Sequence, residues 1–316
     1  MLNQRLLFIY TETPLHAGTG RGLGAVDLPI QREKVTGYPL VQGSSLKGRL
    51  RAAVREAKGW DDKSDELAEL FGRAGGEGDN WAGAIAPGDA KLLLFPVRSL
   101  AGVFAWVTSV DALARFVRDA AIAGIALNWD LKTTPGENQC WIAQKSAVAP
   151  GNQVTLEEFS YTASPNAMVD KDVDGRLSVA GWLSKYAMPT TPEYAYWRNS
   201  LAAHLVILPR EDFRDFTVSG TEVVTRVKLV PDIKTVQSGA LWTEEALPAD
   251  ALLYAPIAYG DSRKQENNKP VKAADEIWRI VSGFSGQRMQ LGGDETTGRG
   301  MVMLRFQEVK NESANR

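Results

Sequence analysis

The sequence predicts an α+β fold, and three observations support this prediction. Short apolar segments with the length of strands alternate with longer amphipathic segments, but without the regular period of a helix-wound parallel sheet. Hydrophobic residues make up 44% of the chain and charged residues 23%, the balance of a folded globular protein. The 316 residues contain no internal repeat and no low-complexity tract, so we expect one elaborated domain or two smaller ones.

The first half of the chain predicts strands around one basic helix. Residues 5–10 are rich in Leu, Phe and Ile, which is typical of a buried strand, and the glycine-rich segment 16–24 that follows is expected to be irregular. A helix is expected to begin at Gly43-Ser44-Ser45, with serine as its N-cap. The same half predicts a short acidic helix over 65–71, strands over 91–97 and 103–107, and a helix over 111–121.

The second half predicts further helices, an extended hairpin and a closing strand. Residues 129–152 are polar and carry no assignable pattern. Residues 223–230 alternate between two faces, 231–239 turn the chain, and 240–244 return as a short strand. The other elements expected are helices over 177–186, 194–203 and from about 209, strands over 204–208 and 252–257, a helix over 273–284, a glycine-rich loop over 289–300, and a strand over 301–306.

Composition narrows the class of protein. No apolar run approaches the roughly 20 residues that a membrane span needs, so no membrane partner is expected. The single cysteine, Cys140, excludes an internal disulfide framework, and we expect the cytoplasm. Two histidines and one cysteine are too few for a zinc site. A bound metal is therefore expected to be a hard ion such as Mg²⁺ or Mn²⁺, held by oxygen ligands.

Charge is unevenly distributed along a chain whose formal net charge is only −2. Residues 42–58 hold five basic residues and one acidic residue, whereas residues 61–79 hold seven acidic and two basic residues. Lys47 and Arg51 lie one turn apart just after the expected helix start, and free N–H groups at a helix start favour a phosphate. This pattern indicates a confined anion site, although an ordinary solvated basic face is the alternative.

A second glycine-rich segment, residues 290–300, leads into the last strand. It lacks the strand-loop-helix order and the Lys-Ser/Thr ending of a P-loop, so nucleotide hydrolysis is excluded. Arg288 and Arg299 beside Gly292 and Gly293 could support a nucleic-acid backbone, and a plain hairpin turn is the alternative.

His16 and Asp27 flank the first glycine-rich segment. An aspartate beside such a segment could coordinate a hard cation or accept a proton. Taken alone, however, these residues favour a structural interpretation, with Asp27 as a loop carboxylate that caps a turn and His16 as a hydrogen-bonded structural histidine.

Seven segments, in the same order, are similar to one known family. They are 14–20 (PLHAGTG), 26–33 (VDLPIQRE), 39–48 (PLVQGSSLKG), 94–99 (LFPVRS), 104–108 (FAWVT), 239–245 (GALWTEE) and 291–300 (LGGDETTGRG). Together they resemble the RAMP superfamily, and most closely the Cmr-type backbone subunits of type III-B CRISPR complexes. The resemblance runs from about residue 6 to residue 306.

The resemblance implies a ferredoxin-like, RNA-recognition-type core with large insertions, so that residues 1–316 form a single RAMP domain. Several copies would line up along a guide RNA together with other Cmr subunits. A protruding β-hairpin, the thumb, would push between guide and target bases. It maps to about residues 226–242, with Arg226, Lys228, Lys234, Leu241 and Trp242 as its expected contact residues.

The resemblance also implies an activity. Relatives with an aspartate at the position of Asp27 cut single-stranded target RNA beside each thumb with a divalent metal, and this chain keeps the aspartate. The expected catalytic residues are Asp27, which would also be the metal ligand, with His16 and Glu244. The expected RNA-binding residues are Gly43, Ser44, Ser45, Lys47, Arg51, Arg21, Arg288, Gly292, Gly293 and Arg299.

Three other interpretations stay open at this point. The chain could be a scaffold that binds guide RNA without cutting. It could be a stand-alone guide-processing ribonuclease of the same superfamily that uses His16 without a metal. It could also be an α+β binding protein unrelated to RNA.

Overall fold

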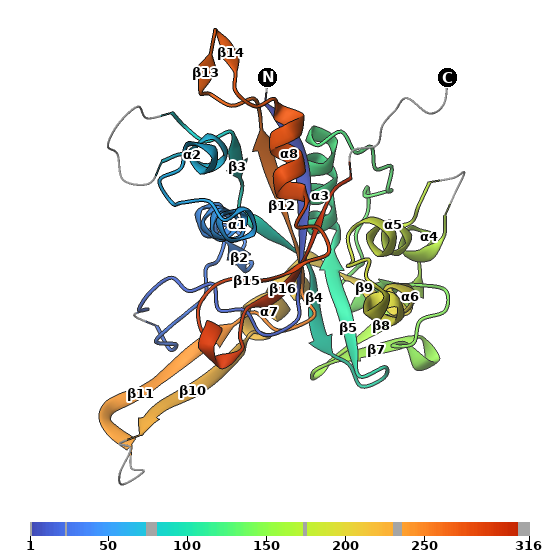
Figure 1. The fold of residues 1–316 in the computed structure, drawn as a ribbon. Helices are drawn as coiled ribbons and strands as arrows, with labels where there is room; N and C mark the ends of the chain where they lie inside the picture. Colours follow the sequence, from blue (N-terminus) through green and yellow to red (C-terminus); the bar gives the residue numbers. More distant parts are fainter. Residues whose placement is uncertain (1, 23, 74–80, 173–175, 230–235, 309–316) are drawn as a thin grey trace.

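The computed structural model describes residues 2–22, 24–73, 81–172, 176–229 and 236–308. Within these ranges twelve strands form one mixed sheet, and helices pack on both of its faces (Figure 1). Most neighbouring strands are antiparallel, whereas β5–β9 and β6–β8 are parallel. The predicted mixture of helices with a large, irregularly connected sheet is therefore confirmed.

The sheet has the strand order β15-β16-β1-β12-β4-β5-β9-β6-β8-β7, with β2 paired to β4 and β3 to β12. Its strands are β1 (Asn3–Thr11), β2 (Leu40–Val41), β3 (Ile85–Pro87), β4 (Ala90–Arg98), β5 (Phe104–Ser109), β6 (Gln139–Ile142), β7 (Gln153–Leu156), β8 (Phe159–Pro165), β9 (Leu205–Leu208), β12 (Leu252–Tyr259), β15 (Arg288–Gln290) and β16 (Met301–Phe306). The α-helices are α1 (Gly43–Lys58), α2 (Asp65–Phe71), α3 (Val110–Ile122), α4 (Ala167–Asp170), α5 (Val179–Tyr186), α6 (Ala195–His204), α7 (Arg210–Ser219) and α8 (Ala274–Ser282).

Four neighbouring strands, β16-β1-β12-β4, are antiparallel throughout. In sequence α1 lies between β1 and β4, and α8 lies between β12 and β16. The position of β1 in the sheet explains the apolar run Leu6–Tyr10 at its centre. Leu7 and Ile9 pack on the face covered by α1 and α8, while Leu6 and Phe8 pack on the other face. Both faces of this part of the sheet are therefore buried.

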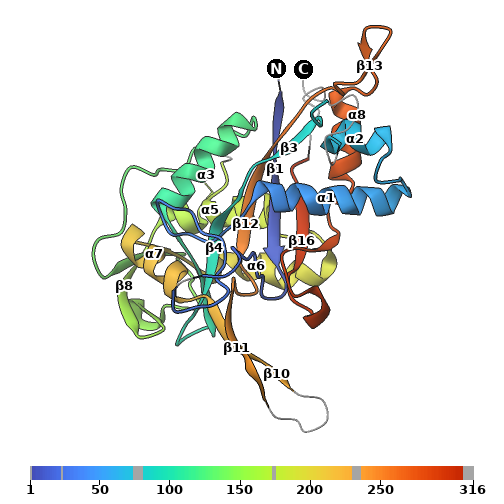
Figure 2. The same cartoon turned by 90° about the vertical axis from the view of Figure 1, so that its left-hand side faces the viewer.

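A two-stranded hairpin projects from the body, formed by β10 (Glu222–Leu229) and β11 (Val236–Ala246) (Figures 1 and 2). Val227 pairs with Leu241 and Thr225 with Thr243, so these four side chains share one face. Arg226 pairs with Trp242 on the opposite face. Residues 230–235, which include Lys234, lie outside the described residues. A smaller hairpin, β13 (Gln265–Glu266) with β14 (Lys269–Pro270), extends from another part of the body.

Two local predictions were wrong. Serine does not cap α1: the N-cap is Gln42, and Ser44 and Ser45 lie inside the first turn. Glycine is required at position 43 because a Cβ there would lie 2.5 Å from the Pro87 carbonyl oxygen. The strand expected from residue 103 starts one residue later, since Val103 has a positive φ of 72°.

Residues 129–152, for which the sequence predicted no element, contain β6. This strand is the first of three, β6, β7 and β8, that form one end of the sheet. These strands are short and carry few consecutive apolar residues, so they gave no pattern that could be recognised. No helix in the described ranges is long and apolar enough to cross a membrane.

Candidate functional site

Asp27 is fastened to the root of the projecting hairpin. Its carboxylate oxygen Oδ2 accepts one hydrogen bond from the Thr243 main-chain N–H at 2.7 Å and a second from the Thr243 hydroxyl at 2.9 Å. The same hydroxyl accepts a hydrogen bond from the Asp27 main-chain N–H at 2.9 Å. Two main-chain hydrogen bonds extend this contact. The Leu28 N–H donates to the Thr243 carbonyl oxygen, and the Glu245 N–H donates to the Leu28 carbonyl oxygen.

The Asp27 side chain is exposed and ionised at neutral pH. The hydrogen bonds from the Thr243 main chain and hydroxyl hold the pKa of this carboxyl below its usual value, and the charge of Arg21 adds to the effect. Among the described residues, none forms a hydrogen bond or ion pair with the second oxygen, Oδ1. The site thus offers one anionic oxygen to the solvent. A carboxylate with a low pKa is a weak proton acceptor but a good ligand for a cation.

His16 joins the two glycine-rich segments and the hairpin root. Its ring Nδ1 lies 2.6 Å from the Glu245 carbonyl oxygen, and its own carbonyl oxygen accepts a hydrogen bond from the Gly293 N–H. Gly292 has a φ of 74°, and a Cβ there would lie 2.3 Å from the His16 carbonyl oxygen. Gly292 and Gly293 therefore allow the second segment to pack against His16. In this structure His16 holds the loops in place.

Glu244 lies on the opposite face of β11 from Thr243, because neighbouring residues of a strand alternate. It is 3% exposed, and its Oε2 accepts a hydrogen bond from Arg226 Nε at 3.3 Å. Burial raises the pKa of the Glu244 carboxyl, and hydrogen bonding to Asp294 together with the charge of Asp294 raises it further. Glu244 thus lies close to Asp294 of the second glycine-rich segment, and Arg226 is its ion-pair partner at 3.3 Å.

Glu245 is also engaged within the protein. Its carboxylate accepts hydrogen bonds from the Arg32 guanidinium, the Ile30 N–H and the Thr221 hydroxyl. These hydrogen bonds hold the pKa of the Glu245 carboxyl below its usual value, although burial acts in the opposite direction. Neither Glu244 nor Glu245 presents a free carboxylate beside Asp27.

The described residues do not make a metal site by themselves. They contain no group of three or more His, Cys, Asp or Glu side chains that could hold an ion. Mg²⁺ in proteins is commonly held by one or two carboxylates together with substrate phosphates and water. An ion at Asp27 would consequently need most of its ligands from RNA and water.

The start of α1 differs from the simple phosphate site that the sequence suggested. Asp89 Oδ1 already accepts the first free N–H of the helix, from Gly43, at 2.8 Å. Arg51 donates to the carbonyl oxygens of Gly72 and Asp62 at 2.8 and 2.7 Å, so its guanidinium holds neighbouring loops. Ser44 and Ser45 are exposed.

Lys47 keeps its ammonium group free of hydrogen bonds and ion pairs to the described residues. Burial lowers its pKa, and the positive charges of Arg263 and Arg51 lower it further. Arg51 is paired with Asp62 at 3.7 Å, whereas Lys47 has no acidic partner among the described residues and is the group here that favours an anionic ligand. Arg263, from the loop after β12, could not be foreseen from the sequence because it lies more than 200 residues away.

The two arginines beside the second glycine-rich segment differ in how free their guanidinium groups are to bind phosphate. Arg288 donates from Nε to both carboxylate oxygens of Glu12, at 3.0 and 2.9 Å, which neutralises its charge. Arg299 is half-buried, and its Nη1 has no hydrogen-bond partner among the described residues. Arg21 is exposed and close enough to Asp27 for its charge to act on that carboxyl.

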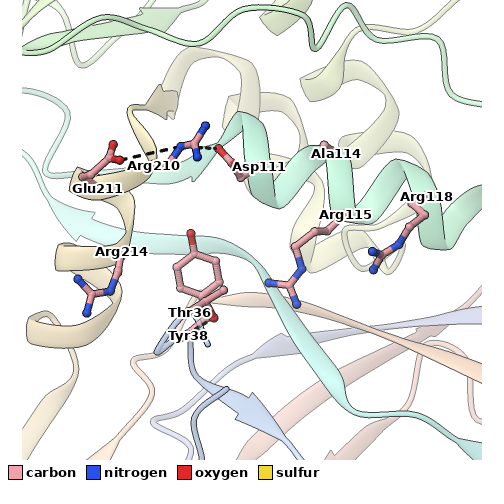
Figure 3. Close-up of a pocket in the computed structure, with 9 residues that line it drawn as sticks. All are labelled: Thr36, Tyr38, Asp111, Ala114, Arg115, Arg118, Arg210, Glu211 and Arg214. Atoms are coloured by element: carbon pink, nitrogen blue, oxygen red, sulfur yellow. Dashed lines mark hydrogen bonds and ion pairs between the residues drawn. The ribbon is translucent and has the colours of Figure 1, made fainter. Parts of the chain in front are cut away.

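A separate cavity of about 620 Å³ lies between α3, α7 and the segment before β2 (Figure 3). Its lining includes Tyr38 and four arginines drawn from two helices. Each arginine has an acidic neighbour: the pairs are Arg115–Glu33 (2.6 Å), Arg118–Asp119 (3.1 Å), Arg210–Asp111 (3.4 Å) and Arg214–Asp215 (3.8 Å). Because the charges are compensated, we do not assign this cavity to an anion.

Sequence reasoning missed Thr243, the residue that contacts Asp27 most closely. Thr243 falls within segment 239–245, which is one of the segments carrying the family resemblance, but nothing in its local pattern indicates a partner 216 residues away. A polar residue on an exposed strand face, at the root of a predicted hairpin, is the only signal available from the sequence.

Comparison with known proteins places the chain in a family. The RAMP superfamily profile matches residues 8–302. The CRISPR system Cmr endoribonuclease Cmr4 of Pyrococcus furiosus is 34% identical over 309 residues, which cover 97% of this chain and 96% of that protein. A crystal structure of oligomeric Cmr4 from the same organism superposes with a TM-score of 0.71, at 29% identity, over 98% of this chain and 99% of that one.

A more distant structure shares the fold. A chain of the type III-B Cmr-beta complex bound to cognate target RNA has a TM-score of 0.69 at 20% identity, over 96% of each chain. The profile match spans most of the sequence, and the P. furiosus relative is matched along nearly its whole length. This chain belongs to the RAMP superfamily and, within it, to the Cmr4 family of CRISPR Cmr systems.

Proposed function

We propose that this chain is the repeated backbone subunit of a type III-B CRISPR ribonucleoprotein, which binds guide RNA and cuts complementary target RNA at regular intervals. One observation carries the proposal: the exposed Asp27 carboxylate is hydrogen-bonded to the root of the projecting hairpin. The endoribonuclease name of the 34% identical P. furiosus relative supports the assignment of cleavage. The oligomeric state of the similar crystal structure supports repetition of the subunit.

The architecture fits these roles. We assign the ferredoxin-like core to β16-β1-β12-β4 with α1 and α8, because the strand order and crossovers match a βαββαβ arrangement. The hairpin β10–β11 is the proposed thumb. Its exposed apolar pair, Val227 and Leu241, lies on the same face as Thr243. The whole chain would then act as one RAMP domain with insertions.

The chemistry follows from the position of Asp27. A continuous A-form duplex keeps each 2′-OH out of line with the adjacent phosphate, whereas a nucleotide displaced by the hairpin can align them. The 2′-oxygen then bonds to phosphorus and the bond to the 5′-oxygen breaks, leaving a 2′,3′-cyclic phosphate and a 5′-OH. The 2′-OH proton passes to solvent, and the departing 5′-oxygen takes a proton from water. In this scheme Asp27 acts as an anion and not as the proton acceptor, in keeping with the Thr243 hydrogen bonds that hold the pKa of its carboxyl below the usual value.

A divalent ion, Mg²⁺ or Mn²⁺, is part of the proposal. Asp27 Oδ1 would be the protein ligand, and RNA phosphates and water would supply the other ligands. When bound, such an ion neutralises charge that develops on the phosphate. The expected partners are guide RNA, target RNA, further copies of this chain and other Cmr subunits. We place the particle in the cytoplasm, in keeping with the buried, unpaired Cys140.

The decisive experiment uses the complex assembled with one guide RNA and incubated with matched and unmatched target RNA, with Mg²⁺ or with a chelator. We expect evenly spaced cuts in the matched target and only in the presence of metal. Matched target that is bound but uncut would favour a scaffold. Cutting that survives the chelator would favour the guide-processing ribonuclease. A low ratio of absorbance at 260 and 280 nm in the natively purified complex would favour a protein unrelated to RNA.

Guide binding gives a prediction of its own. Lys47→Ala should weaken RNA binding equally for all sequences and lower the slope of log affinity against log salt by about one, since a phosphate contact carries no base information. Arg51→Ala should instead lower thermal stability, because Arg51 holds the carbonyl oxygens of Gly72 and Asp62. Filter-binding titrations at several salt concentrations measure the slope, with the exposed Lys58→Ala on the same helix as control. An unchanged slope for Lys47→Ala would remove α1 from the RNA path.

A further inference from the structure

The Thr243 hydroxyl is both a hydrogen-bond acceptor and a hydrogen-bond donor toward Asp27. It accepts a hydrogen bond from the Asp27 main-chain N–H, and it donates its own proton to Asp27 Oδ2. Because the incoming N–H occupies the hydroxyl oxygen, the hydroxyl proton is directed toward the carboxylate. The pair therefore fixes both the backbone and the side chain of Asp27, and it leaves Oδ1 as the oxygen that has no partner within the part of the chain that the structure describes.

Other bonds keep the segment in place when the hydroxyl is removed. The Thr243 N–H still donates to Asp27 Oδ2, Leu28 N–H donates to the Thr243 carbonyl oxygen at 3.0 Å, and Glu245 N–H donates to the Leu28 carbonyl oxygen at 3.0 Å. A valine at position 243 would preserve the β-branched shape that suits a strand. The hydroxyl is thus separable from the fold. Its loss leaves the carboxylate held by one hydrogen bond in place of two, which fixes its orientation less firmly, while the chain around it stays paired.

We propose that Thr243 is a positioning residue, which orients the Asp27 carboxylate so that Oδ1 faces the RNA cleaved beside the hairpin. This inference rests on the proposed function, since it presupposes that Asp27 takes part in cleavage. Thr243 itself touches no reacting atom. Its contribution should appear in the rate of cutting and not in the affinity for target RNA.

The test compares Thr243→Val, Thr243→Ser and Asp27→Ala in the assembled complex. Single-turnover cleavage of a matched target and the target dissociation constant are measured for each. We expect Thr243→Val to cut about tenfold more slowly with an unchanged dissociation constant, since one hydrogen bond to a charged group is lost. Thr243→Ser should restore the rate to within about twofold, because serine keeps the hydroxyl.

Thr225→Val is the matched control. Thr225 lies directly opposite Thr243 on the same face of the hairpin, so the same substitution there tests any general effect on the strands. A cleavage rate for Thr243→Val within threefold of wild type, with Asp27→Ala inactive, would overturn the positioning role alone. Equal losses in Thr225→Val and Thr243→Val would overturn it as well. If Asp27→Ala cuts at the wild-type rate, the proposed role of Asp27 in cleavage is overturned, and the positioning role of Thr243 that rests on it is overturned too.

Discussion

Asp27→Asn in the assembled complex should cut matched target RNA at least about 100-fold more slowly than wild type, the scale on which loss of a single charged or proton-transferring group acts. Asparagine has the shape of aspartate, and its carbonyl oxygen can still accept both hydrogen bonds from Thr243. The loop should therefore stay docked, while the negative charge that Oδ1 presents is lost. Single-turnover cleavage of end-labelled target, with excess complex, measures the effect.

Assembly and binding are the controls for that result. Guide loading and target affinity should stay within about twofold of wild type, because phosphate and pairing contacts are unaffected. Asp215→Asn, at an exposed site on α7, removes the same charge elsewhere and should change nothing. A loss below about tenfold for Asp27→Asn in a complex that still binds target would make Asp27 a loop residue and leave the scaffold interpretation as the better one.

The second large effect is expected on the apolar face of the hairpin. Val227 and Leu241 are paired across β10 and β11, and they are 46% and 63% exposed. Exposed apolar side chains on a projecting hairpin suit insertion between stacked bases, as apolar wedges do in other nucleic-acid complexes. Replacing both with aspartate should slow target cutting by at least about tenfold, since the charge is repelled by phosphates and no longer displaces a base.

The fold should survive this double substitution because both side chains already face solvent. Leu100→Asp, at an exposed position in the β4–β5 connection, is the control for adding an acid to an apolar surface residue. Guide loading and the thermal transition should match wild type in both variants. Normal cutting at the normal positions by the double variant would assign base displacement to another segment. Residues 230–235, which include Lys234 and lie outside the described residues, are then the first to replace.

Much of the fold was readable from local patterns because those patterns arise from burial. Residues 6–10 are apolar at every position since this part of β1 is buried on both faces. The stripe of α1, with Leu46, Leu50 and Val54 buried, follows the helical period. The hairpin was predicted from alternation. Its first strand has the expected length but lies one residue earlier, whereas its second strand is longer than expected because pairing runs from Val236 to Ala246.

The site could be predicted only in part, because its contacts join distant segments. Asp27 was identifiable as a candidate from its place beside the glycine-rich segment. Its partner, Thr243, depends on how β11 folds back against residues 26–30. Arg51 was assigned to phosphate from its spacing to Lys47, yet carbonyl oxygens of other loops take its donors. Local spacing predicts which face a charge lies on, but not which groups arrive there from elsewhere.

Because Asp27 is hydrogen-bonded to β11, each subunit holds its carboxylate at a fixed distance from the exposed apolar residues of the hairpin. Leu241 and Thr243 are two residues apart on one strand face, so the wedge and the carboxylate are separated by a strand rise of about 7 Å. That offset is built into a single subunit and cannot vary with the length or the ends of the target. Under the proposed function, each subunit would cut at one fixed position along the RNA, and the fragment lengths would report the spacing between neighbouring subunits. Trimming the target should shorten the terminal fragments and leave the internal ones unchanged.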